Sequence, residues 1–282
     1  MKVFGSRRMG RCALLRRLAV VVVTAGITLS AAANADIRDT GVLIGDPESD
    51  GETVLRVFDA DSDSLDAADE PHRFYVELML MRAQMRLARE LYRVGDRGAG
   101  TAHFVAPAEA HLPVVRDSLM DRGLERVVER IEDLAAAARE TDSLIDVQDL
   151  YATTRMAIRR AQREVEPSLR EDARFQGEVL LAMSGRAVRQ LEAAVDEEGA
   201  VTDRLAYRVS WAYVAQGERL LDTFEGLLRM SDETRYEQLV ERYERFAELW
   251  PGRTPPERID TGLEDVRTAL EAMAEVVGAE SG

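Results

Sequence analysis

The chain has 282 residues, with 52 acidic and 37 basic side chains and a formal net charge of −15 at pH 7. This acidic balance argues against nucleic acids and anionic membranes as partners, because both attract positive surface. After residue 35 the sequence contains no cysteine, lysine or asparagine, and its histidines are His72, His103 and His111. Thiolate nucleophiles, disulfides, zinc–thiolate sites and lysine catalysis are therefore excluded from that part of the chain.

Residues 1–35 are typical of a secretory signal peptide. They carry six positive charges and no acid, then an apolar segment at residues 18–29 and the small-residue motif Ala33-Asn34-Ala35. The apolar segment is shorter than the roughly 20 residues of a spanning helix, and no later stretch is apolar enough to span. We expect a periplasmic or secreted mature chain without a transmembrane span. The arginine pair at residues 7 and 8 leaves the general and the twin-arginine routes open.

Residues 36–70 are expected to form an acidic, flexible arm, since twelve acids stand against two arginines there. Within the arm, Asp59, Asp61, Asp63 and Glu70 stand at positions 1, 3, 5 and 12 of a calcium-loop pattern. Position 6 is Ser64, where the sharp turn of such a loop favours glycine. We favour a solvated acidic linker and keep a weak calcium site as the alternative.

The first helix is predicted from Pro71 to about Val94. Apolar residues recur there at steps of three and four, which is the period of one helix face. The glycines at positions 95, 98 and 100 are expected to end this helix. Its methionines are interpreted as core packing rather than as metal ligands.

Three further helices are predicted before residue 167. After a loop that contains His103, one helix should run from Pro107 to Arg122. Others should cover residues 124–139 and 144–165, because apolar residues keep the helical period in both stretches.

Two strongly periodic runs between residues 167 and 230 flank a break at residues 197–204. Neither run would be stable alone in water, so we expect an antiparallel helix pair that buries its apolar stripes. Thr202 is expected to cap the second helix, and Asp203 to place negative charge at its positive end.

A helix over residues 232–250 carries a carboxylate stripe, and a last helix follows from Leu263. Four glutamates at helical spacing could collect a cation, but arginines are interleaved with them, so we favour an arginine-neutralised solvent face. The stripe consists of Glu237, Glu241, Glu244 and Glu248.

The fold prediction is all-α, an antiparallel helical bundle of six to eight helices over residues 71–278, in one domain.

Several short motifs resemble those of a known group of proteins. They are Leu91-Tyr92-Arg93-Val94-Gly95, His103-Phe104, Pro107, Glu109, Arg122-Gly123, Trp250-Pro251 and Pro255-Pro256. With them the chain resembles an uncharacterised family of exported all-helical bacterial proteins. Residues 196–216 are similar to a segment that this family shares with the extracytoplasmic region of high-affinity iron permeases. The resemblance implies an exported helical domain.

The motif residues that could hold a metal in that family are mostly replaced in this sequence. Its Glu-Tyr-Gln-Asp motif reads Ala206-Tyr207-Arg208-Val209, its Gly-Phe reads Ala212-Tyr213, and two expected histidines read Gln84 and Ala106. The retained polar side chains His103, Glu109 and Tyr207 are our candidates for ligand contact. The alternative is that His103 caps a loop and Glu109 supports a helix N-terminus.

We predict a non-enzymatic binding or accessory module of the cell envelope, without a cofactor. Its partner would be an envelope protein or a cationic ligand. The alternative is a periplasmic metal-handling protein for calcium or iron with a degenerate site. An enzyme that uses a carboxylate pair, as glycosidases do, is the least favoured hypothesis.

Overall fold

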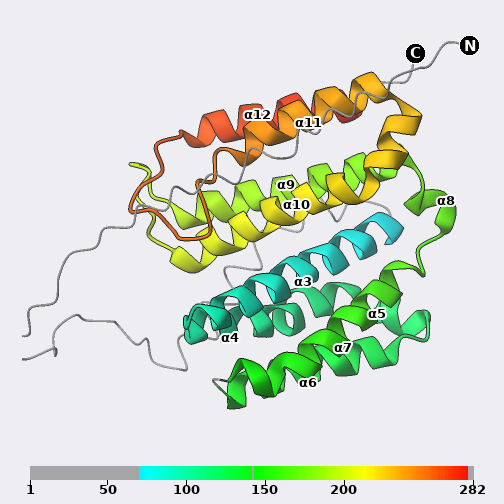
Figure 1. The fold of residues 1–282 in the computed structure, drawn as a ribbon, viewed down its shortest axis with the longest axis vertical. Helices are drawn as coiled ribbons and strands as arrows, with labels where there is room; N and C mark the ends of the chain where they lie inside the picture. The colour runs from blue at the N-terminus through cyan, green and yellow to red at the C-terminus, as the bar shows by residue number, and fades with distance from the viewer. Residues whose placement is uncertain (1–69, 142, 279–282) are drawn as a thin grey trace, which may run out of the picture. The chain divides into compact units, whose positions relative to one another are not determined.

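A computed structural model describes residues 70–141 and 143–278. The predicted signal peptide and the acidic arm up to residue 69 lie outside the described residues. Every regular element that the structure describes is helical, which confirms the all-α fold class (Figure 1). Within these residues we find no helix with both the length and the apolar character that crossing a bilayer requires.

The helices stack in layers around the long helix α3 (Figure 1). Helices α11 and α12 pack on α9 and α10, which in turn pack on α3, and α3 contacts α4 and α7. Helix α6 packs on α4 and α7. In chain order the elements are α3 (Glu70–Arg93), α4 (Arg97–Ala106), the π-helical turn η1 (Pro107–His111), α5 (Leu112–Asp121), α6 (Glu125–Glu140), α7 (Leu144–Gln162), α8 (Pro167–Arg170), α9 (Ala173–Ala194), α10 (Arg204–Ser231), α11 (Glu233–Ala247) and α12 (Leu263–Gly278).

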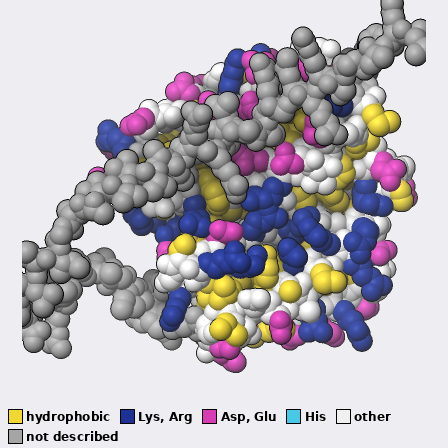
Figure 2. All heavy atoms as spheres, in the orientation of Figure 1, with side chains coloured by type: hydrophobic (Ala, Val, Ile, Leu, Met, Phe, Trp, Pro, Cys, Tyr) yellow, Lys and Arg dark blue, Asp and Glu magenta, His cyan; other side chains and the backbone are white. Residues whose placement is uncertain are grey.

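Many of the exposed charged side chains on the described helices form ion pairs. The glutamate stripe of α11 is exposed, and Glu241 and Glu237 form ion pairs with Arg245 and Arg229. The expected solvent face is confirmed, whereas its neutralisation by arginine is seen at these two glutamates and not at Glu244 and Glu248 within the described residues. Figure 2 shows a different pattern on one face, where basic side chains gather in a band over α10, α3 and α7.

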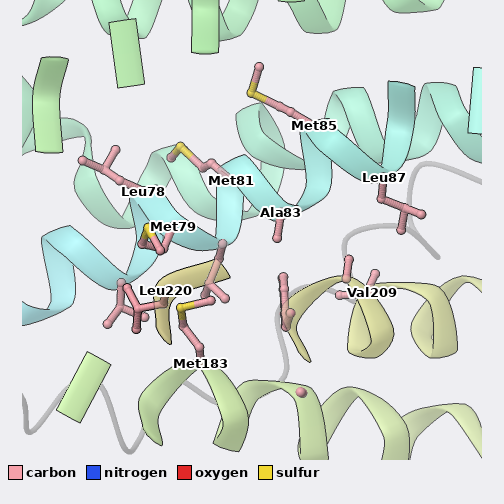
Figure 3. Close-up of a cluster of buried hydrophobic side chains, with 14 of the residues drawn as sticks. Leu78, Met79, Met81, Ala83, Met85, Leu87, Met183, Val209 and Leu220 are labelled. Atoms are coloured by element: carbon pink, nitrogen blue, oxygen red, sulfur yellow. The ribbon is translucent and has the colours of Figure 1, made fainter. Parts of the chain in front are cut away.

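Helix α3 supplies much of the core, because almost its whole circumference is buried. Met79 points toward Met183 of α9 and Leu220 of α10, whereas Met81 and Met85 point to the other side of α3 (Figure 3). All five side chains are buried. The interpretation of the α3 methionines as core packing is therefore confirmed.

The stretch between Gly95 and Pro107 is helical, so the prediction of a loop there was wrong. Gly95 alone among these glycines adopts a positive φ, of 85°, and ends α3. Gly100 lies inside α4, where a Cβ atom would overlap the ring of Tyr92. The glycine is thus required for close packing of α4 on α3 rather than for a turn.

Proline within a helix changes the hydrogen-bonding pattern locally. Pro107 has no N–H to donate and its ring crowds the preceding turn, and the helix continues there through the π-helical turn η1. The expected helix from Pro107 is therefore divided into η1 and α5, and α8 is an additional short helix. For these reasons the described residues contain more helical segments than the six to eight expected.

The turn between α9 and α10 is held by local hydrogen bonds. The Asp203 carboxylate accepts from the backbone N–H groups of Leu205 at 2.8 Å and Ala206 at 2.9 Å. Thr202 instead donates its hydroxyl hydrogen to the carbonyl of Ala194 at 3.4 Å. The expected cap at Thr202 was therefore wrong, because α10 begins at Arg204 and the residue directly before it is Asp203.

Two glycines of α10 provide a matched test of this packing. In Gly217→Ala the new methyl group would overlap the hydroxyl of Tyr243, which donates to the Val214 carbonyl at 2.7 Å. We expect this substitution to lower the free energy of unfolding by about 2 kcal/mol through overpacking. In Gly226→Ala the methyl group meets nothing within 4 Å. Because alanine favours the helix more than glycine, we expect the free energy of unfolding to rise by up to about 1 kcal/mol. Urea unfolding followed by circular dichroism measures both, and equal effects would contradict this account of the α10–α11 contact.

Candidate functional site

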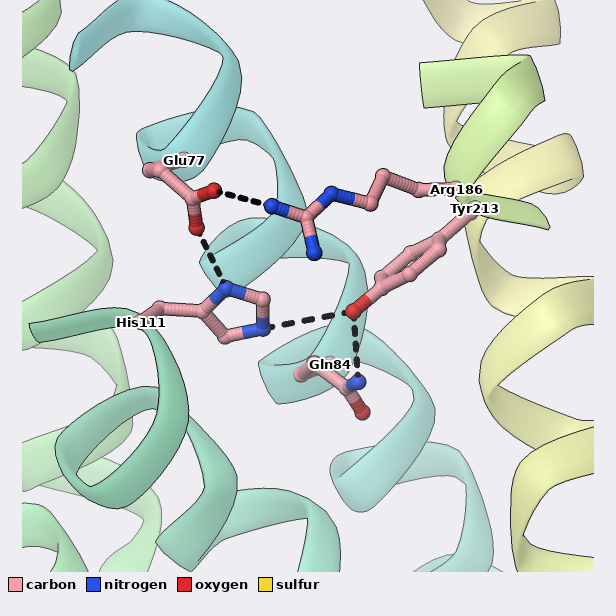
Figure 4. A network of polar contacts seen from close by, with 5 residues as sticks. All are labelled: Glu77, Gln84, His111, Arg186 and Tyr213. Carbon is pink, nitrogen blue, oxygen red and sulfur yellow. Dashed lines mark hydrogen bonds and ion pairs between the residues drawn. The ribbon is translucent and has the colours of Figure 1, made fainter. Parts of the chain in front are cut away.

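Polar side chains from five elements meet inside the bundle, and we call this set the buried polar network. Figure 4 shows its members except His103. Two of these side chains, Glu77 and Gln84, lie on the same side of α3, seven residues or about two helical turns apart. Each of the six side chains belongs to a buried residue. The network consists of Glu77 and Gln84 from α3, His103 from α4, His111 from η1, Arg186 from α9 and Tyr213 from α10.

The carboxylate of Glu77 is the charged centre of the network, and its residue is only 1% exposed. One oxygen lies 2.6 Å from Nδ1 of His111, and the other accepts from the guanidinium of Arg186 at 3.3 Å. A carboxylate without such partners would pay a large desolvation penalty at this depth. Glu77 therefore fixes the positions of η1 and α9 against α3.

A chain of hydrogen bonds continues from the other side of the His111 ring. The Tyr213 hydroxyl lies 3.2 Å from His111 Nε2 and accepts from the Gln84 amide at 3.1 Å. The Gln84 carbonyl oxygen lies 2.6 Å from Nδ1 of His103. Since an amide oxygen can only accept, Nδ1 of His103 carries the hydrogen.

Burial fixes the protonation states of two network members. The pKa of His103 is lowered to about 3, first by burial and then by the positive charge of Arg208. Burial also raises the pKa of Tyr213 well above its ordinary value. Around neutral pH the imidazole of His103 is thus neutral and the hydroxyl of Tyr213 keeps its hydrogen. Neither group has a pKa near 7, as an efficient general acid or base would need.

The hollows that we identify on the described surface are lined by other residues. One of about 410 Å³ lies among the ends of α9 to α12, and one of about 100 Å³ lies between α3 and α10. A third borders the connector at residues 251–256, and a fourth borders the α9–α10 turn. No network residue lines any of the four. The network side chains join helices by contacts with one another.

The structure separates the three side chains predicted as ligand contacts. His103 lies inside α4 and belongs to the network, so its alternative role as a loop cap was wrong. Glu109 lies in η1 and forms a partly exposed ion pair with Arg139 of α6. Tyr207 is buried and donates to the Gly252 carbonyl at 3.1 Å, and burial raises its pKa to about 12. The three side chains therefore serve different contacts.

The predicted calcium loop can be followed at one of its four positions. Asp59, Asp61 and Asp63 lie outside the described residues. Glu70 is the first residue of α3 and forms an ion pair of 2.6 Å with Arg122. Among residues 70–141 and 143–278 no three or more histidine, aspartate or glutamate side chains come together as a metal site would need. The calcium loop stays a prediction.

Most of the network escaped sequence reasoning, although one signal was visible. Glu77 and Gln84 are separated by two helical turns, and Arg82 is the only polar residue in the apolar run between them, which is unusual for solvent-facing residues. Gln84 and Tyr213 also occupy positions where the family resemblance implied other side chains. Arg186 gave no comparable signal, because charged residues recur throughout α9.

Comparison with models of known protein families, with characterised proteins and with solved structures gave no match. The resemblance to an exported helical family and to iron permeases stays a prediction. Functional arguments for this chain therefore start from its own side chains.

Substitution of one buried and one surface glutamate tests the role of the network. Glu77→Gln leaves the buried guanidinium of Arg186 without its carboxylate, and we expect the free energy of unfolding to fall by about 3 to 5 kcal/mol. Glu109→Gln breaks an ion pair at the surface and should cost less than about 1 kcal/mol. Urea unfolding measures both, and equal losses would contradict a central role for Glu77.

The depressed pKa of His103 predicts a pH dependence of stability. The ordinary pKa near 6.5 applies to the unfolded chain, so the unfolded chain binds the proton first as pH falls. The stability that His103 contributes is complete above about pH 6.5 and declines toward pH 3. Between pH 7 and pH 5 we expect a loss of about 2 kcal/mol from this residue.

The matched variant is His103→Asn, whose amide N–H can still donate to Gln84. It should lose about 2 kcal/mol less than the unmodified chain between the same two pH values. Urea unfolding at both values measures the difference. Parallel losses in the two proteins would show that His103 accepts a proton in the folded state as readily as in the unfolded chain.

Proposed function

We propose that this chain is an exported, non-enzymatic helical module of the cell envelope that binds or assists another protein. The observation that carries the proposal is the burial of Glu77, His111 and Tyr213, whose hydrogen bonds are directed at one another. A catalytic acid or base must come within hydrogen-bond reach of its substrate, directly or through one water. Side chains placed in this way stabilise a scaffold whose exposed residues make the contacts.

Export is supported by the sequence alone, through the basic head and apolar segment of residues 1–35. The absence of lysine and cysteine after residue 35 removes amine and thiolate nucleophiles from the possible covalent catalysts. The exposed Arg–Glu pairs on the described helices fit a charged, well-solvated surface.

A cationic ligand is the second candidate, and one hollow favours it. The hollow beside the α9–α10 turn is bordered by four acidic residues, Asp196, Glu197, Glu198 and Asp260, of which no three converge as in a metal site. The Asp196 carboxylate already accepts from the backbone N–H groups of Glu198 at 3.1 Å and Ala200 at 2.8 Å. Calorimetric titration of the mature protein with calcium tests this candidate, and absence of heat and of a melting-temperature shift would remove it.

Site-specific photocrosslinking in living cells tests the proposed binding role. A photoreactive residue placed at the exposed positions Val94, Met156 or Met230 samples the turn after α3, α7 and α10. A binding module should give a discrete adduct from one position and not from all three, because a specific interface covers a limited patch. The same adduct should form in the Tyr213→Phe variant, since the network only supports the scaffold. Absence of adducts from every position would contradict the proposal.

A further inference from the structure

Five arginines form a continuous positive surface on this acidic protein, and we call it the arginine face. On α3 they stand at steps of four and three, and on α7 at a step of four, so each set follows one side of its helix. Helices α3 and α7 pack against each other, and Figure 2 shows the resulting basic band over these helices. The arginine face consists of Arg82, Arg86 and Arg89 of α3 and Arg155 and Arg159 of α7.

The arginine face concentrates arginines that form no ion pair within the described residues. Elsewhere arginines such as Arg116 and Arg174 pair with a neighbouring glutamate. Within the described residues, none of the five comes within ion-pair distance of a carboxylate. Arg82 donates to the Gln162 amide oxygen at 2.7 Å. Its pKa is lowered by burial and by the charges of Arg159 and Arg155, so these like charges are held close together.

An aromatic ring holds part of this surface in place. The guanidinium groups of Arg89 and Arg155 lie 5.5 Å and 5.8 Å from the centre of the Tyr151 ring. Such contacts restrict the two side chains before any ligand arrives. A pre-ordered guanidinium loses less entropy when it forms paired hydrogen bonds with an anion.

A small hollow beside Arg86 adds an independent sign of a ligand. It has a volume of about 100 Å³, lies between α3 and α10, and its polar lining residues include Arg86, Arg219, Gln216 and Glu90, whose carboxylate pairs with Arg253. Gln216 is 2% exposed, and its amide oxygen has no hydrogen-bond donor among the described residues. A buried acceptor of this kind is normally satisfied in a native protein. A ligand at this hollow would therefore be expected to supply an N–H or O–H group.

We propose that the arginine face and the Gln216 hollow bind an extended, carboxylate-rich polypeptide segment of a partner protein. The proposal rests on the proposed function and names the chemistry of the partner. Carboxylates match the paired donors of guanidinium groups, and a peptide N–H matches the Gln216 oxygen. Alternate side chains of an extended strand are about 6.6 Å apart, and arginines four residues apart on a helix are about 6 Å apart along its axis.

A polypeptide fits this surface better than other polyanions. A carboxylate or a phosphodiester has no hydrogen to donate to Gln216 around neutral pH, whereas every peptide unit except proline has one. The net charge of −15 also repels a planar anionic bilayer or a long nucleic acid. A narrow acidic segment can follow the arginines while remaining distant from most surface carboxylates.

Fluorescence anisotropy with a labelled peptide of alternating glutamate and threonine tests the proposal on the mature protein. We expect saturable binding that weakens with salt, and no binding of the peptide with glutamine in place of glutamate. The double variant Arg86→Gln with Arg89→Gln should bind at least tenfold more weakly. The matched control is Arg242→Gln with Arg245→Gln, which removes two arginines at the same spacing from α11 and should retain the original affinity.

Gln216→Leu tests the hollow separately from the charges. It should weaken the acidic peptide about threefold or more while leaving the melting temperature unchanged or higher, because the buried acceptor is removed. Tighter binding of inorganic phosphate or of phosphatidylglycerol vesicles than of the peptide would overturn the choice of partner. Absence of peptide binding, or equal losses in the two double variants, would overturn the arginine face. Discrete photocrosslinks from cells would in that case still support the broader binding role.

Discussion

The fold depends on the buried carboxylate of Glu77. Without partners, a carboxylate at this depth would carry a large desolvation penalty. Glu77 lies on the central helix α3 and is matched by His111 from η1 and Arg186 from α9. Loss of either partner leaves charge or polarity unsatisfied inside the bundle. Helix packings that fail to bring all three together are thus disfavoured, and the network specifies one arrangement in a core otherwise built from adaptable methionines.

Helix α3 has two polar faces with opposite environments. Glu77 and Gln84 face inward and are satisfied by other helices. Arg82, Arg86 and Arg89 are partly exposed and have no carboxylate partner among the described residues. The same helix therefore fixes the fold and presents the surface that we assign to a partner. Because α3 is anchored in the core, its arginines are positioned before a partner binds. This lowers the entropy that is lost on binding.

Net charge and local charge lead to different expectations for the partner. The overall charge of −15 indicated a cationic ligand or a protein partner. Some surface arginines pair with nearby acids, whereas the five of the arginine face form no ion pair within the described residues. Because exposed charges are screened beyond about 8 to 10 Å in physiological salt, a bound segment responds mainly to the side chains it touches. An acidic segment can consequently bind an acidic protein.

The sequence by itself determined the fold class, most helix limits and the packing role of the methionines, since these follow from apolar periodicity along single helices. It also showed that cysteine and lysine chemistry is excluded after residue 35. It did not determine that His103 would meet Gln84, that His111 would meet Glu77, or that Glu109 would point to the surface. Those contacts join residues 19, 34 and 30 positions apart, and they depend on the π-helical turn at Pro107 and on how α3, α9 and α10 pack. Only the tertiary structure decided them, because periodicity assigns a residue to a helix face but not to the neighbour it meets there.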